Sequence, residues 1–489
     1  MKKLKLVLVM LACVHGMQAF AKSDDIRYED FLLKDSSKVI HGTLDNGFQY
    51  YIVKLPMDHF QMSLVQKGGD HNDGETIEIS HFLEHMMLTA NRQLAIGGTL
   101  RSYLNKLGKD YGTGFNGYTA PYFMAYELYQ LKSNRAYADS CMAILSELAY
   151  NASICAIDIE EQRERVLHEL TNRKYMSGAR IVDALFAAFT YGCDLEQWRE
   201  KRLNSTKKIT QSQLEAFYKK WYQPQRQCLV VSGKIPDGIE EMIKRQFGNH
   251  PSQPTPTPPT LDYQQRNFTI SRVGSPTCNI ILYFDQPLLT PSEKESPKFF
   301  RDYYALKKGS KALSDKIEKN KKEHINSFVK GLVDERFSMQ MGFAYNIHDE
   351  DPESGLQALV DSMTVFLDDV RNNGVQISMA ADTLKESLVE QRRSEAKTKL
   401  KEGNGKDNTL DESLPIINCF VHSLPIYKQE DSDAYWSYEL SGKDISNYCK
   451  KFINESTLKI QCILPYGYPE KEITEKLNAL LQRYNNKSK

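Results

Sequence analysis

The sequence predicts an α+β protein built from two similar halves, and three observations favour this architecture. The chain has 489 residues, more than one ordinary domain uses. The stretch PSQPTPTPPT, at 251–260, contains five prolines and is typical of an extended, semi-rigid linker. A similar series of elements occurs before this linker and again near the C-terminus.

The repeated series begins at Phe217 in the first half and at Tyr448 in the second, 231 residues later and without a gap. Each copy has a helix end of the form aromatic-x-Lys-Lys-aromatic, then a short turn, a β-rich run and another helix. This match predicts an internal duplication. The second half is expected to repeat the order of the first, with long helices near 308–330 and 378–402.

The first half is expected to open with strands and to continue mainly with helices. Asp45-Asn46-Gly47 predicts a turn between strands, and strands are expected at 48–53 and 60–68. The run 112–131, rich in Tyr, Phe and Thr, predicts a pair of strands. Helical periodicity predicts helices at 78–90, 97–107, 134–149, 158–173, 178–190 and 210–221.

The composition argues against a nucleic-acid-binding protein. Lys and Arg together number 63, and so do Asp and Glu, so no global basic field is expected. Eight cysteines outside the N-terminal segment are widely spread without a C-x-x-C pair, which argues against a cysteine zinc finger. No stretch after the N-terminus approaches the roughly 20 apolar residues of a spanning helix, so we expect no transmembrane segment there.

The N-terminus has the three regions of a secretory signal peptide. A lysine-rich start precedes the apolar run 6–12 and the A-x-A pattern Ala19-Phe20-Ala21. We therefore expect cleavage after Ala21 and export, to a periplasm of the Gram-negative type. The apolar run is too short for a membrane anchor, and a lipoprotein attached through Cys13 is a less favoured alternative.

The stretch ISHFLEHMML, residues 79–88, places His81, Glu84 and His85 on one face of a predicted helix. Two imidazoles one turn apart can bind one Zn²⁺ ion. Glu84 can then accept a proton from the water that the metal activates. H-x-x-E-H is the inverted form of the commoner H-E-x-x-H motif. The alternative is a polar seam on an ordinary helix, but the apolar flanks indicate burial, where polar side chains need partners.

A catalytic zinc site needs a third protein ligand. The carboxylate-rich helix predicted at 157–174 supplies Glu169, which lies among apolar residues and is our candidate. His168 is about 100° round the helix and is expected at the surface. Glu161 and Glu164 are the next candidates for the third ligand.

These motifs resemble the pitrilysin family of zinc peptidases, which includes insulin-degrading enzyme and the mitochondrial processing peptidase. The chain is most similar to bacterial, exported members. The resemblance runs through LDNGFQYYIVKLP, SHFLEHMML, FNGYTAPYFMAYEL, RVLHEL, WYQPQRQCLVVSGKI and, in the second half, DERFSMQMGFAYNI. It implies two similar α+β domains that form a clam shell, with the active site facing an interior that short or unfolded peptides can enter.

The resemblance also assigns roles to individual residues. It implies one zinc ion per chain, bound by His81, His85 and Glu169, with Glu84 as the general base. We therefore expect a metalloendopeptidase that cleaves peptide substrates and does not bind nucleic acid. A homodimer, or a heterodimer with a related subunit, is the assembly that the family suggests.

Three further residues are implied to contact the substrate. Asn116 would lie on the strand against which the substrate backbone is held by strand addition. Arg336 and Tyr345 would come from the second half and contact the substrate or the developing oxyanion. The second half has no H-x-x-E-H motif of its own, so one metal site is expected.

The chain also departs from the family pattern. A glutamate that often lies seven residues before the third ligand is replaced by Gln162, and the small residues before the first histidine are replaced by 78–80, EIS. A shift of the alignment by one residue would put Leu170 at the ligand position. The alternative function is therefore a catalytically weak or silent member that acts as a partner or scaffold subunit; a hydrolase of non-peptide substrates is a third interpretation.

The expected organisation has four segments. They are a signal peptide at 1–21, an N-terminal metallopeptidase domain at 22–250, a proline-rich linker at 251–262 and a C-terminal pitrilysin-like domain without the metal motif at 263–489.

Overall fold

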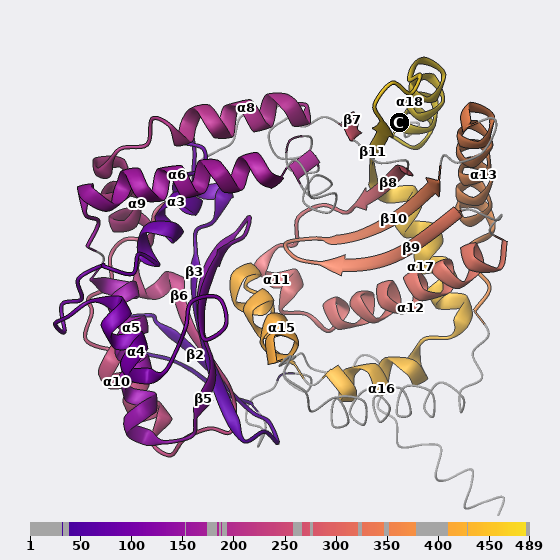
Figure 1. Ribbon diagram of the computed structural model, residues 1–489. Coiled ribbons are helices and arrows are strands. Elements are labelled where there is room, and N and C mark those ends of the chain that lie inside the picture. The colour runs from indigo at the N-terminus through magenta and orange to yellow at the C-terminus, as the bar shows by residue number, and fades with distance from the viewer. Residues whose placement is uncertain are drawn as a thin grey trace, which may run out of the picture.

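The computed structural model describes two mixed sheets, each built from one part of the chain and each covered by helices (Figure 1). The expected α+β architecture with two similar halves is thereby confirmed. The described residues are 32, 39–151, 153–173, 183–184, 187, 193–257, 267–273, 277–320, 325–346, 352–377, 409–427 and 429–485. The predicted signal peptide, the helix near 378–402 and most of the helix at 178–190 lie outside them.

The first sheet has the strand order β1-β2-β6-β3-β5-β4. The β2–β6 pair is parallel and the other neighbours are antiparallel. The central strand β3 is buried almost throughout, which explains its nearly continuous apolar sequence. The strands are β1 Val39–Thr43, β2 Gln49–Lys54, β3 His59–Lys67, β4 Phe115–Thr119, β5 Phe123–Lys132 and β6 Gln227–Gly233.

Helices of the first half cover one face of this sheet and form its main core with it (Figure 1). Their apolar stripes pack on the sheet and on one another, as expected for amphipathic helices. The helices are α3 Ile79–Met87, α4 Leu100–Leu107, α5 Arg135–Tyr150, α6 Ala156–Arg173, α8 Leu195–Thr206, α9 Gln211–Trp221 and α10 Ile239–Phe247. Helix α8 was not predicted from the sequence.

The predicted turn at 45–47 is confirmed and joins β1 to β2. Gly47 has φ 86°, a left-handed conformation that glycine adopts without strain. The buried Asn46 accepts a hydrogen bond from the Phe48 amide at 3.1 Å. Its own amide donates to the carbonyls of Phe247 and His250, so the hairpin is fixed to the end of α10.

The second sheet has the order β7-β11-β8-β10-β9, and its helices form a separate core with it. Its strands are β7 Phe268–Val273, β8 Thr277–Asp285, β9 Ile325–Val333, β10 Phe337–Asn346 and β11 Thr457–Pro465. The helices of this half are α11 Pro291–Lys294, α12 Pro297–Asn320, α13 Pro352–Asn373, α15 Thr409–His422, α16 Gln429–Glu439, α17 Gly442–Glu455 and α18 Lys471–Asn485.

The two sheets have the same connectivity, apart from the additional edge strand β1. The series β2-β6-β3-β5-β4 corresponds to β7-β11-β8-β10-β9, including the parallel pair at one end. The series α9-β6-α10 corresponds to α17-β11-α18, at the offset that the sequence repeat indicated. The predicted internal duplication is therefore present in the structure.

The helix predicted near 308–330 is wrong in its last part. Helix α12 ends at Asn320, and residues 325–333 form β9. The Lys-rich run before β9 favours a helix by local propensity. However, β9 pairs with β10 over its whole length, from Ile325 to Val333. Strand pairing, which depends on distant residues, overrides the local preference.

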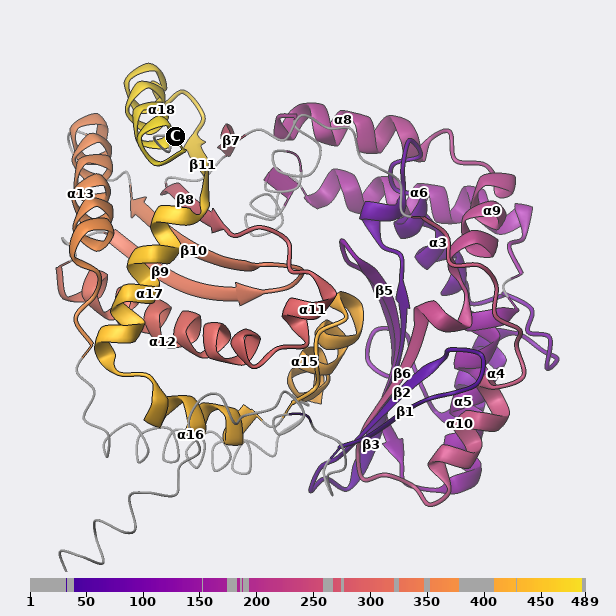
Figure 2. The same ribbon diagram turned by 180° about the vertical axis from the view of Figure 1, so that it is seen from behind.

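Helix α15 belongs to the second part of the chain but packs on the other face of the first sheet (Figure 2). Ile417 and Phe420 are buried against a cluster that includes Tyr51 and Val230. The Ser413 hydroxyl lies 3.1 Å from that of Ser232 in β6. The first sheet is therefore covered on both faces. Within the residues that the structure describes, no helix has both the length and the apolar character needed to span a membrane.

Candidate metal centre

Helix α3 carries the H-x-x-E-H motif and is buried as the sequence predicted. It contacts α6, α9 and strand β4. Its apolar side chains lie in the core of the first half; they are Ile79, Phe82, Leu83, Met86 and Met87. Asp73 caps its beginning, because the Asp73 carboxylate accepts hydrogen bonds from the amides of Glu78 at 2.7 Å and Ser80 at 3.1 Å.

Helix α6 presents Glu169 to the two histidines. Val166 and Leu170 anchor this helix in the core and fix its rotation. The Glu169 Oε2 atom then lies 3.4 Å from His85 Nε2 and 3.6 Å from His81 Nε2. Glu169, which is more than 80 residues from the two histidines in sequence, is thus brought next to them.

The two distances from Glu169 are close to those between the ligands of a zinc ion. A tetrahedral Zn²⁺ with bonds of about 2.0–2.1 Å holds neighbouring ligand atoms about 3.3–3.4 Å apart. One donor atom from each of His81, His85 and Glu169 lies within 4.8 Å of the other two. In the described part of the chain, no other group of three such side chains has this geometry. Two imidazoles and one carboxylate are also a typical donor set for catalytic zinc.

Hydrogen bonds and opposite charges connect His81, His85 and Glu169. Burial alone would lower the pKa of His81, but hydrogen bonds to Glu169 and Glu78 raise it well above its ordinary value. Hydrogen bonds from His81 and His85 lower the pKa of Glu169. The Glu169 side chain remains 44% exposed, whereas those of His81 and His85 are 11% and 20% exposed. The group is therefore open to solvent on the Glu169 side.

Glu84 lies beside this group and is almost completely buried. Its Oε2 atom accepts a hydrogen bond from the Thr119 hydroxyl at 3.2 Å. Burial raises the pKa of Glu84, an effect that the nearby His81 and His85 partly offset. A carboxylate with a raised pKa, next to the candidate ligands, is suited to accept a proton.

Glu78 makes contacts that sequence reasoning missed. Its Oε2 atom lies 2.9 Å from His81 Nδ1, and its Oε1 atom accepts a short hydrogen bond from Arg202 Nε. Burial alone would raise the pKa of Glu78, but the charge of Arg202 and the hydrogen bond with His81 lower it to about 2. The only signal in the sequence was the unusual EIS tripeptide before the first histidine.

The other candidates for the third ligand lie elsewhere on α6. Leu170 is buried in the core. Glu161 is exposed and pairs with Arg165 at 2.7 Å. Glu164 and His168 are also exposed. Only Glu169 among these residues joins the two histidines.

The three residues implied to contact substrate lie on strands or at a turn. Asn116 is in β4, the edge strand of the first sheet, and is paired with Glu127 of β5. Arg336 lies at the turn between β9 and β10, where its amide donates to the Asp334 carboxylate. Tyr345 is in β10, buried in the core of the second half. Their roles stay predictions.

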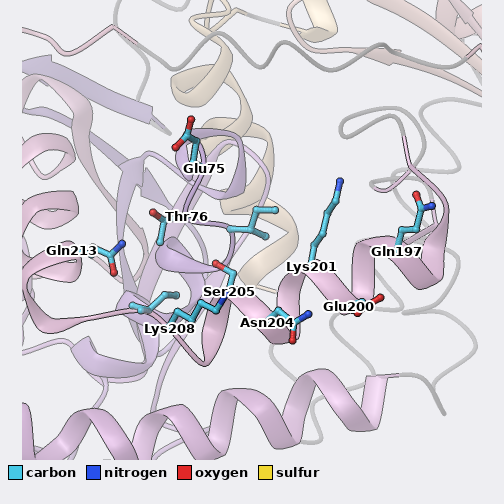
Figure 3. A pocket seen from close by; sticks show the side chains of 11 residues that line it. Glu75, Thr76, Gln197, Glu200, Lys201, Asn204, Ser205, Lys208 and Gln213 are labelled. Carbon is cyan, nitrogen blue, oxygen red and sulfur yellow. The ribbon is translucent and has the colours of Figure 1, made fainter.

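A separate cavity of about 650 Å³ lies beside the segment that leads into α3 (Figure 3). None of the three candidate ligands lines it. Polar side chains of α8 and α9 and of the segment before α3 surround it; the lining residues are Glu75, Thr76, Ile77, Gln197, Glu200, Lys201, Asn204, Ser205, Lys208, Ile209 and Gln213.

Comparison with protein families gives two matches. Residues 56–197 match the family described as "Insulinase (Peptidase family M16)", and these residues include all three candidate ligands. Residues 208–308 match the "Peptidase M16 inactive domain". The second match begins between α8 and α9 of the first half and extends across the proline-rich segment into the second half.

Curated relatives are similar at low identity. The "Probable zinc protease PqqL" of Escherichia coli is 23% identical over 279 residues, which is 54% of this chain and 29% of that protein. The mitochondrial-processing peptidase subunit beta of Dictyostelium discoideum is 24% identical over 219 residues, 44% of this chain and 45% of that protein. The matches span less than a third of the first relatives' own length.

Solved structures share the fold. The periplasmic protease PqqL from Escherichia coli has a TM-score of 0.67 at 18% identity, covering 94% of this chain and 51% of that one. The first half of the same protease has a TM-score of 0.66 and is covered to 99%. A protease from Helicobacter pylori has a TM-score of 0.64 at 16% identity, covering 87% of this chain and 99% of that one.

Proposed function

Because the chain belongs to the pitrilysin/insulinase family of peptidases, we propose that it is a zinc-dependent endopeptidase acting on peptides or unfolded polypeptides. The observation that carries this proposal is the approach of Glu169 to His81 and His85, at separations that suit tetrahedral zinc. We propose one zinc ion per chain, since the second half has no such motif.

The residues of the candidate centre would have different roles in peptide hydrolysis. Zinc, when bound by His81, His85 and Glu169, would polarise the peptide carbonyl and lower the pKa of a water molecule. Glu84 would accept the proton of that water at its carboxylate and pass it to the leaving nitrogen. The Thr119 hydroxyl keeps one carboxylate oxygen of Glu84 in a fixed position. The raised pKa of Glu84 favours a carboxyl that holds the proton between the two steps.

The edge strand β4 would bind the substrate backbone. It ends the first sheet, so one of its edges has no neighbouring strand among the described residues. A peptide that adds to this edge would form main-chain hydrogen bonds with little dependence on its sequence. Thr119 is the last residue of β4 and contacts Glu84, so the added strand would run past the general base. Asn116 lies on the same strand.

The remaining expectations form part of the same proposal. We propose the segments 1–21, 22–250, 251–262 and 263–489 as signal peptide, metallopeptidase domain, linker and C-terminal domain. Export to the periplasm agrees with the signal-like N-terminus and with the periplasmic protease to which the chain is similar. Arg336 and Tyr345 are proposed as substrate contacts from the second half, and a homodimer or a heterodimer with a related subunit as the assembly.

Substitution of the general base tests this function. Glu84→Gln should keep the zinc, because Glu84 is not a ligand, but should lower cleavage of a quenched fluorescent peptide by at least about 100-fold. The matched control is Glu161→Gln, an exposed carboxylate that pairs only with Arg165 on the same helix in the contacts seen here. Zinc content by atomic absorption and peptide cleavage are measured on the same preparations.

The outcomes separate the candidate functions. Full activity in Glu84→Gln would refute the role of this residue as general base. A wild-type protein that binds zinc but cleaves no peptide would favour the silent partner or scaffold subunit, the alternative that Gln162 suggests. A wild-type protein that binds no zinc would refute the proposal as a whole.

A further inference from the structure

The backbone of Glu78 adopts a conformation that residues with a side chain avoid. It has φ 76° and ψ 5°, in the left-handed region, directly before α3. Such a conformation favours glycine because a Cβ atom is strained there. Glu78 is nevertheless a large residue, and it is only 2% exposed. A strained, buried carboxylate next to a candidate metal ligand suggests that the side chain has a function.

The carboxylate of Glu78 connects His81 to a buried chain of charges. One oxygen lies 2.9 Å from His81 Nδ1 and the other accepts from Arg202 Nε. Arg202 Nη1 also lies 3.3 Å from Asp183 Oδ1, and Asp183 accepts a hydrogen bond from Arg173 at 2.8 Å. Alternating charges of this kind compensate one another, which makes their burial tolerable. These four charged side chains and His81 connect the start of α3 to α6 and α8.

This contact determines which nitrogen of His81 faces the metal position. A neutral imidazole carries one N–H group. A carboxylate at Nδ1 accepts a hydrogen bond and so holds the proton on that nitrogen, which leaves the lone pair of Nε2 free to bind a metal. Nε2 is the atom that lies 3.6 Å from Glu169 Oε2. The tautomer and the orientation of the ring are therefore fixed together.

The position on α6 where a carboxylate is expected holds an amide instead. Gln162 lies seven residues before Glu169 and is buried. An amide carries no charge, so Gln162 does not supply the negative charge that a carboxylate would. Glu78, the residue that precedes α3, supplies a buried carboxylate to His81.

We propose that Glu78 is a positioning residue of the metal centre, which orients His81 and is itself held by Arg202. This inference rests on the proposed function, because it requires a metal at His81. It predicts that metal affinity depends on a residue that is not a ligand. Partners of ligating histidines typically contribute 10–100-fold to metal affinity.

Two substitutions of Glu78 and one control test the proposal. Glu78→Gln keeps the shape of the side chain but removes its charge. Glu78→Gly removes the side chain at a position whose backbone suits glycine. Both should raise the dissociation constant for zinc by about 10–100-fold, measured by competition with a chromophoric chelator. The control is Glu75→Gln, an exposed carboxylate three residues earlier, which should leave the constant unchanged.

A spectroscopic readout separates positioning from loss of structure. In the cobalt-substituted protein, both Glu78 variants should shift the visible absorption bands of the metal, whereas Glu75→Gln should not. The unfolding temperature of the metal-free protein checks that the variants are folded. Both Glu78 variants should unfold cooperatively but at a lower temperature than the wild type, because the buried Arg202 loses the carboxylate that compensates its charge.

The possible failures are distinguishable. Wild-type zinc affinity and an unchanged cobalt spectrum in both Glu78 variants would refute the positioning role while leaving the zinc site intact. A wild-type protein that binds neither metal would refute the proposed function itself, and the positioning role with it. A loss of affinity in Glu75→Gln as large as in Glu78→Gln would also overturn the inference, since it would indicate a general effect of charge.

Discussion

At the scale of single residues, the side chains of the candidate centre have two kinds of partner. Some partners are close in sequence, and others are far away in sequence. His81, Glu84 and His85 could be predicted because helical periodicity is local. Glu169 could be predicted because it lies near the apolar face of its own helix. The partner of Glu78 could not, because Arg202 is 124 residues away and a left-handed backbone at Glu78 has no sequence signal.

The third ligand can be tested by a conservative substitution. Glu169→Gln should weaken zinc binding by more than about 100-fold, since losing a direct ligand costs more than losing a partner of a ligand. The metal-free fold should be unaffected because the side chain is 44% exposed. Zinc affinity is measured with a competing chelator, and Glu164→Gln serves as the exposed control on the same helix.

Unchanged zinc affinity in Glu169→Gln would contradict this assignment. If Glu164→Gln or Glu161→Gln released the metal instead, the third ligand would be one of those residues, and the geometry around His81 and His85 would need another explanation.

At the scale of elements, most helices and strands follow their local pattern, and the exceptions have a common cause. Strand β9 was predicted as helix because its pairing with β10 cannot be read from its own residues. The position of α15 on the first sheet also could not be predicted from its own sequence. This helix packs on a sheet that ends almost 180 residues earlier in the chain, through contacts that depend on tertiary structure alone.

The docking of α15 can be measured through Phe420, which is 2% exposed and packs beside Tyr51 with the Lys67 ammonium 4.5 Å from its ring. Phe420→Ala should lower the free energy of unfolding by about 3–5 kcal/mol, because it leaves a cavity under the helix. Chemical denaturation provides the measurement. Leu414→Ala, on the same helix but 41% exposed, should change it by at most about 0.5 kcal/mol. Equal effects of the two substitutions would contradict the docked position of α15.

At the scale of the whole molecule, the duplication could be predicted from the sequence. The two halves are nevertheless expected to differ in function. The repeat of α9-β6-α10 as α17-β11-α18 was visible in the sequence because both copies kept aromatic residues and paired lysines at the same spacing. The equivalence of the complete sheets required the structure, since their strand pairings join distant segments. Only the first half carries the H-x-x-E-H motif, so the two similar halves are expected to contain one metal centre between them.

The zinc centre can be tested most directly by anomalous scattering at the zinc absorption edge, measured on a crystal of the protein grown with zinc. We expect one strong peak per chain, within about 2.0–2.2 Å of His81 Nε2, His85 Nε2 and a carboxylate oxygen of Glu169. A peak at other residues, or no peak at this group in a crystal that contains zinc, would contradict this expectation.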